Sequence, residues 1–257
     1  MPDLEAALRA RRDAGGPAFV PYVTGGFPGV DAGLLRSLQD AGADAVEVGI
    51  PFSDPVMDGG VIQEASRLAL AAGARPSGIL TTIAEADLEV PVAVMTYVNP
   101  VYRHGFAAFL DEATEAGVAG AIVPDLPVDE GEGWSRACGE HGLASVQLAA
   151  PGTSDERLAR IASASHGFVY CVATYGVTGS RDGLAATGRE LVGRLRPLTD
   201  LPLLLGVGVG TPELAAEAAS FADGAIVGSA LMRKLLEDDH GGFATLVGEF
   251  RAALRTG

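Results

Sequence analysis

A glutamate and two aspartates lie close together between residues 47 and 59. Glu47 falls within the apolar run Ala43–Val48, which predicts a short buried β-strand. A carboxyl group near the end of such a strand finds a partner or takes a shifted pKa, because burial disfavours its charge. The following loop contains two prolines and carries Asp54 and Asp58. Glu47 and one loop aspartate could form an acid–base pair, although a solvated turn with helix-capping aspartates is the alternative for the loop.

The elements that must position these carboxyls are predicted by short apolar runs that alternate with amphipathic segments. The expected strands are Phe19–Thr24, Ala43–Val48, Val92–Tyr97, Gly120–Val123, Ala144–Ala149, Gly167–Cys171, Leu203–Val207 and Gly224–Val227. The expected helices are Leu4–Arg12, Asp31–Ala41, Val61–Ala72, Gly78–Ala86, Phe106–Ala116, Glu130–His141, Asp155–Ala164, Gly188–Pro197, Pro212–Ala219, Leu231–Leu236 and Phe243–Leu254. Eight strands with intervening helices predict a single (β/α)8 TIM barrel over residues 1–257, with an extra N-terminal helix. A doubly wound sheet competes less well, because it rarely needs eight strands in this length.

The composition is that of a globular protein, with 48% hydrophobic and 20% charged residues. A net charge of −15 argues against nucleic acid and anionic membranes as partners, because both require a basic surface. The sequence has no apolar core of signal-peptide length and no run of 18 apolar residues, so we expect a cytoplasmic protein. Cys138 and Cys171 make neither a disulfide framework nor a metal site, and we expect two buried thiols.

Glycine-rich segments follow the last predicted strands, at the end of the barrel where active sites lie. The run Gly206–Gly210 ends the seventh strand, and Gly228 and Ser229 follow the eighth strand and open a helix. Glycines let main-chain N–H groups approach an anion, and a helix N-terminus favours negative charge. These two loops therefore predict a phosphate site, with simple tight turns as the alternative. The polar loop of residues 173–183 is expected to be either a mobile lid or an ordinary surface loop.

Several motifs in a fixed order make the similarity to one known family specific. The two most distinctive are Pro-Phe-Ser-Asp-Pro at residues 51–55 and Gly-Val-Thr-Gly at residues 176–179. Further matching segments are Phe19–Thr24, Ala41–Asp58, Val61–Gln63, Met95–Pro100, Pro124–Pro127, Gly206–Gly208 and Gly228–Ser229. They extend from residue 19 to about residue 235. On these segments the chain resembles the family of tryptophan synthase α subunits. Members of that family are indole-3-glycerol-phosphate lyases.

The resemblance implies a role for each matching residue. The catalytic glutamate and aspartate of the family correspond to Glu47 and Asp58. Substrate-binding positions of three kinds also correspond: tyrosines that line the indole pocket or support the catalytic pair, lid residues that close over the ligand, and phosphate binders. The tyrosines are Tyr22, Tyr97 and Tyr170. The lid residues are Thr178, which contacts the aspartate, and Gly179. The phosphate binders are Gly179, Gly208, Gly228 and Ser229. Two departures are Gly60, where proline is usual, and Thr174-Tyr175, where some members have an arginine-containing pair.

The implied reaction is the retro-aldol cleavage of indole-3-glycerol phosphate to indole and glyceraldehyde 3-phosphate, the penultimate step of tryptophan biosynthesis. A protonated Glu47 would deliver a proton to indole C3 and then accept one from the side-chain hydroxyl. An ionised Asp58 would hydrogen-bond the indole N–H and stabilise the charge that grows on the ring. The only lysine, Lys234, falls in a predicted helix, and the four histidines mostly fall away from strand ends. Both observations argue against a Schiff-base or metal-dependent aldolase.

The resemblance also implies a β subunit as partner, in an α2β2 heterotetramer. We expect no cofactor and no metal in this chain, and pyridoxal phosphate in the β partner, which would consume the indole. Docking of that partner on the loop Pro51–Asp58 is expected to order the loop and to activate a slow lyase. Two alternatives stay open: a stand-alone lyase that releases free indole, and a silent homologue that only regulates its partner. The presence of both Glu47 and Asp58 counts against the silent homologue.

Overall fold

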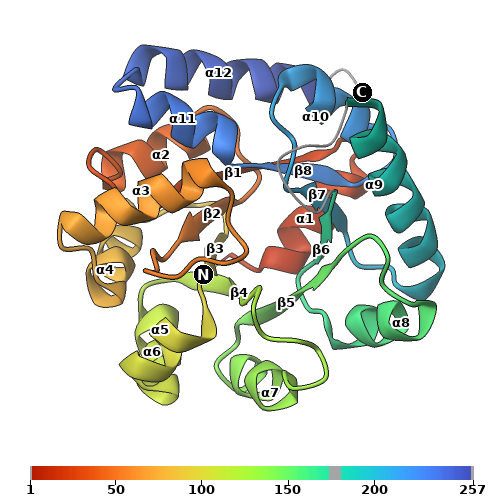
Figure 1. Cartoon of the computed structure of the whole chain (residues 1–257), viewed down its shortest axis with the longest axis horizontal. Helices are drawn as coiled ribbons and strands as arrows, with labels where there is room; N and C mark the ends of the chain where they lie inside the picture. The colour runs from red at the N-terminus through yellow and green to blue at the C-terminus, as the bar shows by residue number, and fades with distance from the viewer. Residues whose placement is uncertain (1, 174–180, 256–257) are drawn as a thin grey trace.

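Eight parallel strands pair in chain order and close into a barrel, because β1 also pairs with β8. The computed structural model describes residues 2–173 and 181–255, and Figure 1 shows the helices arranged in a ring outside the strands. The predicted (β/α)8 barrel is therefore confirmed. The strands are β1 Ala18–Thr24, β2 Val46–Gly49, β3 Val92–Met95, β4 Val118–Ile122, β5 Ala144–Ala149, β6 Val169–Val172, β7 Leu203–Gly206 and β8 Gly224–Val227.

The helices follow the predicted order with one addition. Their bounds are α1 Leu4–Asp13, α2 Ala32–Asp40, α3 Gly60–Ala71, α4 Pro76–Ala86, α5 Val98–His104, α6 Phe106–Glu115, α7 Glu132–Glu140, α8 Asp155–Ala164, α9 Arg181–Leu195, α10 Pro212–Ala219, α11 Ser229–Leu236 and α12 His240–Ala253, with a 3₁₀ turn at Arg196–Leu198. Within the described residues, five helices have an N-cap side chain that accepts a hydrogen bond from a backbone N–H of the first turn. The caps are Asp3 for α1, Asp31 for α2, Ser154 for α8, Thr211 for α10 and Asp239 for α12. Such caps satisfy N–H groups that a helix leaves free in its first turn.

Helix α5 is the element that the sequence pattern did not predict. We expected the third strand to reach Tyr97, but β3 ends at Met95 and Tyr97 is the N-cap of α5. The backbone N–H of Val98, the first helical residue, donates to Oδ1 of Asp125 at 2.9 Å. A carboxylate from the β4–α7 loop thus caps a helix that follows β3. Because this cap is distant in sequence, local periodicity gives little sign of it.

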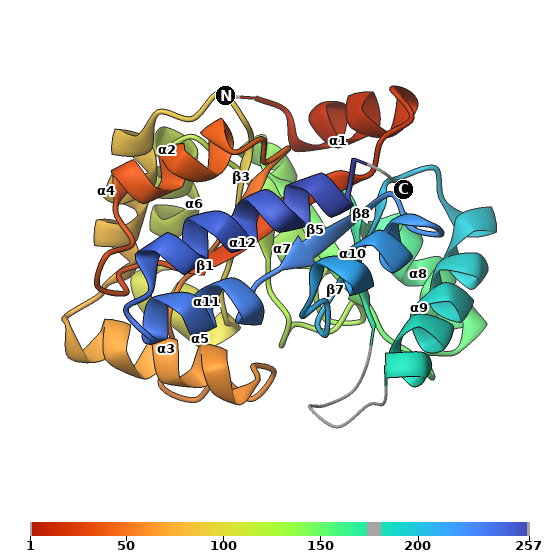
Figure 2. The same ribbon diagram turned by 90° about the horizontal axis from the view of Figure 1, so that it is seen from above.

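Helix α1 covers one end of the barrel, as Figure 2 shows. Its buried residues Leu4 and Leu8 belong to the same apolar cluster as the interior strand residues. Leu4 lies against two glycines: a Cβ atom at Gly120 or Gly167 would come within 2.7 or 3.1 Å of its Cδ2 atom. The glycines therefore leave the space that lets this leucine close the N-terminal end of the barrel.

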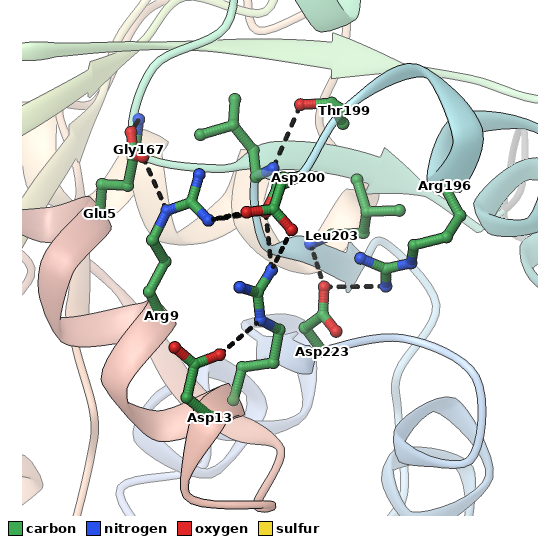
Figure 3. A network of polar contacts seen from close by, with 11 residues as sticks. Glu5, Arg9, Asp13, Gly167, Arg196, Thr199, Asp200, Leu203 and Asp223 are labelled. Carbon is green, nitrogen blue, oxygen red and sulfur yellow. Dashed lines mark hydrogen bonds and ion pairs between the residues drawn. The ribbon is translucent and has the colours of Figure 1, made fainter.

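Ion pairs hold α1 against the loop that precedes β7 (Figure 3). Arg9 contacts both Glu5 and Asp200, and Arg12 donates to the carbonyl oxygen of Asp200 at 2.6 Å. Nearby, Asp223 accepts from Arg196 and from the backbone N–H of Leu203, each at 2.8 Å. The arginines tie the helix to the loop before β7, and Asp223 joins the start of β7 to the residue before β8, at the end of the barrel opposite the strand C-termini. Most of these groups are partly exposed, so each pair contributes only modestly to stability.

We predict that Gly224→Ala destabilises the closure between β1 and β8. A Cβ atom at Gly224 would lie 2.5 Å from the carbonyl oxygen and 2.8 Å from Cβ of Ala18, its partner in the barrel. Overpacking of this kind costs about 1–3 kcal/mol. The matched control is Gly193→Ala on the exposed side of α9, where a Cβ atom meets nothing within 4 Å. That change should stabilise by about 0.5–1 kcal/mol. Urea unfolding of both variants measures the difference, and equal midpoints would contradict this account of closure.

Candidate active site

The Glu47 carboxyl lies at the centre of the site and is almost completely buried. Glu47 sits on β2 beside Tyr22 of β1 and is 1% exposed. Both of its carboxyl oxygens are buried and have no hydrogen-bond partner in the described part of the chain. Burial, together with the nearby Asp58 carboxyl, raises the pKa of Glu47 to about 8. A carboxylic acid in this environment keeps its proton near neutral pH and can donate it.

Asp58 lies near Glu47 but belongs to the loop between β2 and α3. Its backbone N–H donates to the carbonyl oxygen of Pro55 at 3.0 Å, and its own carbonyl accepts from Nε2 of Gln63 at 2.8 Å. Burial outweighs the lowering effect of a hydrogen bond from the Tyr97 hydroxyl, so the pKa of Asp58 is raised to about 6. The pKa of Asp58 therefore stays below that of Glu47. The other loop aspartate, Asp54, is exposed and accepts from the Ser53 hydroxyl at 2.6 Å.

Tyr97 also fixes the backbone of the loop that carries Asp58. Its hydroxyl oxygen accepts from the backbone N–H of Met57 at 3.1 Å, and its ring lies 5.3 Å from the Phe52 ring, centroid to centroid. One side chain from the β3–α5 junction thus contacts the loop near its start, at Phe52, and near its end, at Met57 and Asp58. The loop is held in place although only its first residues are buried.

Two further tyrosines face the interior around Glu47. A Cβ atom at Gly49 would lie 2.1 Å from the Tyr22 hydroxyl, and one at Gly206 would lie 2.4 Å from the Tyr170 hydroxyl. Glycine at these two strand ends therefore provides room for the tyrosine hydroxyls. Burial raises the pKa of both tyrosines well above its ordinary value, and the Glu47 and Asp58 carboxyls raise it further. Both hydroxyls remain protonated and can act only as neutral hydrogen-bonding groups.

The two glycine-rich loops after β7 and β8 have backbones suited to an anion. Val207 has φ +55° and Gly208 has φ +107°, and both are exposed. A β-branched residue in the left-handed region is strained, and such strain is common at functional sites. At β8, Gly228 is the N-cap of α11 without a side-chain hydrogen bond, and Ser229 is exposed at the first helical position. The first N–H groups of α11 thus lack the side-chain cap that α10 has in Thr211.

The structure brings most of the predicted residues to the same end of the barrel. A Cβ atom at Gly228 would lie 3.1 Å from the Tyr22 ring, so the loop after β8 adjoins the tyrosines around Glu47. Thr178 and Gly179, together with Thr174-Tyr175, lie outside the described residues. Three groups that hold the site in place had no predicted positioning role: Gln63, Asp125 and the Met57 backbone. Gln63 and Asp125 stood within matching motifs, but their contacts are to backbone atoms, which a motif does not reveal.

Comparison with known proteins adds independent information. The family model for the tryptophan synthase alpha chain matches residues 8–250. The chain belongs to this family. A tryptophan synthase alpha chain from Streptomyces avermitilis is 45% identical, and the match covers 99% of this chain and 95% of that protein. A structure of Mycobacterium tuberculosis tryptophan synthase superposes with a TM-score of 0.91 at 40% identity, covering 99% of this chain and 98% of the other. The alpha subunit from Legionella pneumophila gives 0.88 at 34% identity, with 99% and 98% coverage.

Membership of the tryptophan synthase alpha chain family confirms the resemblance and the predicted lyase activity. The alpha reaction cleaves indole-3-glycerol phosphate to indole and glyceraldehyde 3-phosphate, and the indole passes to a beta chain. Within residues 2–173 and 181–255, no group of three histidine, cysteine or acidic side chains could hold a metal ion. In the same ranges no helix is long and apolar enough to cross a bilayer. Cys138 and Cys171 are buried free thiols, as expected.

Nothing in the described part of the structure requires glycine rather than the family's usual proline at residue 60. Gly60 is the first residue of α3, and a Cβ atom at this position would meet nothing within 4 Å. Gly59, the N-cap before it, is extended at φ −75° and ψ 162°, the backbone that precedes proline most readily. Proline is well suited to the first turn of a helix. The position is therefore compatible with proline, and glycine leaves the unfolded loop with more conformational freedom.

We predict that Glu47 makes stability fall as pH rises. Its folded-state pKa is about 8 and its ordinary value is 4.5, so between these values the folded chain holds a proton that the unfolded chain releases. Stability from this group is complete below pH 4.5 and is lost as pH rises through about 8. The free energy of unfolding of Glu47→Gln, relative to wild type, should therefore increase between pH 5 and pH 9. Urea unfolding measures it, with the exposed Glu249→Gln as control. Parallel curves for wild type and Glu47→Gln would contradict the raised pKa.

Proposed function

We propose that Glu47 and Asp58 carry out the alpha reaction of this family as an acid–base pair. The observation that supports the proposal is the Glu47 carboxyl, which is buried, has no hydrogen-bond partner in residues 2–173 and 181–255, and lies near a second carboxyl on a tethered loop. Between pH values of about 6 and about 8, Asp58 is ionised while Glu47 keeps its proton. The two carboxyls then differ in charge at neutral pH, and each is in the form that its role requires.

The proton movements follow from the chemistry of the substrate. Indole is a poor leaving group as a carbanion, so Glu47 protonates C3 of the ring before the bond to the glycerol chain breaks. The carboxylate that remains then accepts the proton of the side-chain hydroxyl as the aldehyde forms, which returns Glu47 to its starting state. Asp58 hydrogen-bonds the indole N–H and stabilises the positive charge on the protonated ring. Tyr22 and Tyr170 lie close enough to Glu47 to interact with its charge, and both are neutral hydrogen-bonding groups.

The indole ring requires apolar walls near the acid. Met95 and Leu148 are partly buried and pack against the interior cluster of the barrel. Met95 pairs with Gly49 across the barrel wall, two residues beyond Glu47, and Leu148 pairs with Tyr170. These positions support an indole pocket between β3 and β6, with Tyr22, Tyr97 and Tyr170 as its substrate-binding tyrosines. The apolar walls also maintain the low dielectric that raises the pKa of Glu47.

Glu47→Gln should abolish cleavage while substrate binding stays nearly intact, because the amide can neither donate the proton nor take it back. General acid–base catalysis contributes roughly 10²- to 10⁴-fold, so the loss of turnover should be at least that large. Asp58→Asn should also be severe, because the amide offers no full negative charge to the ring. The matched control is Asp54→Asn, an exposed carboxyl in the same loop. Indole release measures turnover, and a Glu47→Gln variant with more than about a tenth of wild-type turnover would overturn the assignment.

The phosphate of the substrate is proposed to lie between the loops after β7 and β8. Gly208, Gly228 and Ser229 would present backbone N–H groups, and the N-terminus of α11 would add a favourable dipole. The positive φ of Val207 and Gly208 supports this role, because it turns successive N–H groups toward one side of the loop. Contacts from the phosphate are remote from the bond that breaks, so they supply binding energy for orientation.

Ser229→Asp tests the phosphate site without removing a structural residue. A carboxylate at a helix N-terminus favours the helix by about 0.3–1 kcal/mol, so folding should not suffer. The same charge should repel a phosphate and weaken the binding of indolepropanol phosphate at least about tenfold, with little effect on indolepropanol. Ser154→Asp, at the capped N-terminus of α8, is the control. Affinities by calorimetry decide the matter. If Ser229→Asp binds both compounds as wild type does, the phosphate lies elsewhere and these glycines only shape turns.

The partner is proposed to be a tryptophan synthase beta chain that carries pyridoxal phosphate, in an α2β2 heterotetramer. This chain would need no cofactor and would act in the cytoplasm as one domain over residues 1–257. Three exposed apolar side chains support docking beside the Asp58 loop: Val56 is 78%, Met57 52% and Tyr102 73% exposed. Exposed apolar groups gathered on the loop and the neighbouring helix α5 are typical of a protein contact. Docking there would fix the position of Asp58 and could thereby raise turnover.

A further inference from the structure

A cavity of about 280 Å³ opens on the outer side of the loop that carries Asp58. It lies between the end of α3, the start of α4 and helix α5, which occupy the same side of the barrel in Figures 1 and 2. Its walls include the apolar side chains of Pro51, Leu70 and Pro100. Pro51 is also the first residue of the Pro-Phe-Ser-Asp-Pro segment. Anything that fills the cavity therefore contacts the base of the catalytic loop.

Two arginines at the cavity, Arg75 and Arg103, have no ion pair within the described residues. Arg75 is the N-cap residue of α4 and Arg103 lies in the last turn of α5; both are exposed. By contrast, arginines of α1, α8, α9 and α12 contact carboxylates. The nearest carboxylate partner at the cavity belongs to its histidine: Nε2 of His104 lies 3.0 Å from Oε2 of Glu112. Two guanidinium groups are thus left beside an apolar hollow.

We propose that this cavity receives an acidic side chain of the partner chain, held between Arg75 and Arg103. The inference rests on the proposed docking of a beta chain, and it specifies the chemistry of one contact in that interface. Guanidinium groups bind carboxylates with paired, charge-assisted hydrogen bonds, and partial exclusion of water by the apolar walls strengthens them. A volume of about 280 Å³ suits a single side chain rather than a larger ligand.

The position and charge of the cavity favour a partner side chain as occupant. Arg103 directly follows the exposed Tyr102, so the cavity is continuous with the proposed docking surface on the loop and α5. The chain as a whole carries a charge of −15, whereas this one cavity is lined by two arginines that have no ion pair within the described residues. A partner that complements the general surface would be basic, whereas at this point it must be acidic. A partner surface that is basic in general but acidic at this cavity can dock in only one position, and a partner without that acidic group binds less well.

The test is binding of the full chain to its cognate beta chain. Removing one guanidinium, in Arg75→Gln or Arg103→Gln, should weaken binding about tenfold, because hydrogen bonds to charged groups are the stronger kind. Reversing the charge, in Arg75→Glu and Arg103→Glu together, should weaken it about 100-fold or more and reduce the salt dependence of the dissociation constant. Arg136→Glu on α7 is the matched control, since Arg136 is exposed and lines no part of the cavity. It should change affinity less than twofold.

Several results would overturn the proposal. Wild-type affinity in the double charge-reversal variant, with unchanged thermal unfolding, would exclude a carboxylate contact at the cavity. An equal loss in Arg136→Glu would indicate a general effect of charge. Saturable binding of benzoate to the isolated chain, lost in Arg103→Gln while affinity for the beta chain persists, would make the cavity a small-carboxylate site instead. Indole release by the isolated wild-type chain is measured separately. An active chain that binds no beta chain would sink this inference and leave the lyase function standing.

Discussion

The rest of the site depends on one interaction that is missing: among the described residues, nothing forms a hydrogen bond with the Glu47 carboxyl inside the closed barrel. An unpaired carboxylate there would be costly, so the group is held as an acid, and its pKa rises to about 8. Such a position survives only where the surroundings cannot rearrange to solvate it. Pairing of β2 with both β1 and β3 supplies that rigidity, and α1 closes the far end of the barrel. The strand pairing that closes the barrel therefore also keeps the Glu47 carboxyl unsolvated and protonated.

The second carboxyl is placed in the opposite way. Asp58 is on a loop, and two side chains fix its position. Tyr97 contacts the backbone N–H of Met57 and the Asp58 carboxyl, and Gln63 donates to the Asp58 carbonyl oxygen. Glu47 can move only if the barrel moves, whereas Asp58 can move with a few loop residues. A site built this way separates a fixed carboxylic acid from a carboxylate whose position can be adjusted. An event on the outer face of the loop can then alter catalysis through Asp58 without disturbing the barrel.

The sequence predicted the barrel well because its strands are short apolar runs, and an acid inside such a run is conspicuous; Glu47 was identified for this reason. Asp58 could not be separated from Asp54 by pattern alone, since both lie in the same proline-containing loop and only the fold makes one of them exposed. Helix α5 was missed because Asp125, from the β4–α7 loop, caps it. Boundaries also shifted where glycine or proline was ambiguous: β3 ends two residues early, and α9 begins seven residues before Gly188. Helix caps and loop contacts between residues far apart in the sequence depend on the tertiary structure, and the spacing of residues along the chain does not predict them.

The charge of the molecule bears on how it could hold a phosphate. No arginine or lysine is among the residues proposed for the phosphate, so backbone N–H groups and the α11 dipole must provide the attraction. These partial charges neutralise a doubly negative ligand only in part. With a phosphate at the proposed site, the remaining negative charge, on the same end of the barrel as Glu47, would raise the pKa of that carboxyl further. A binding site made of N–H groups rather than cations therefore favours the protonated acid at the moment the ring must be protonated. A lysine in the phosphate loops would tighten binding, but it would also lower the pKa of Glu47 and oppose the first proton transfer.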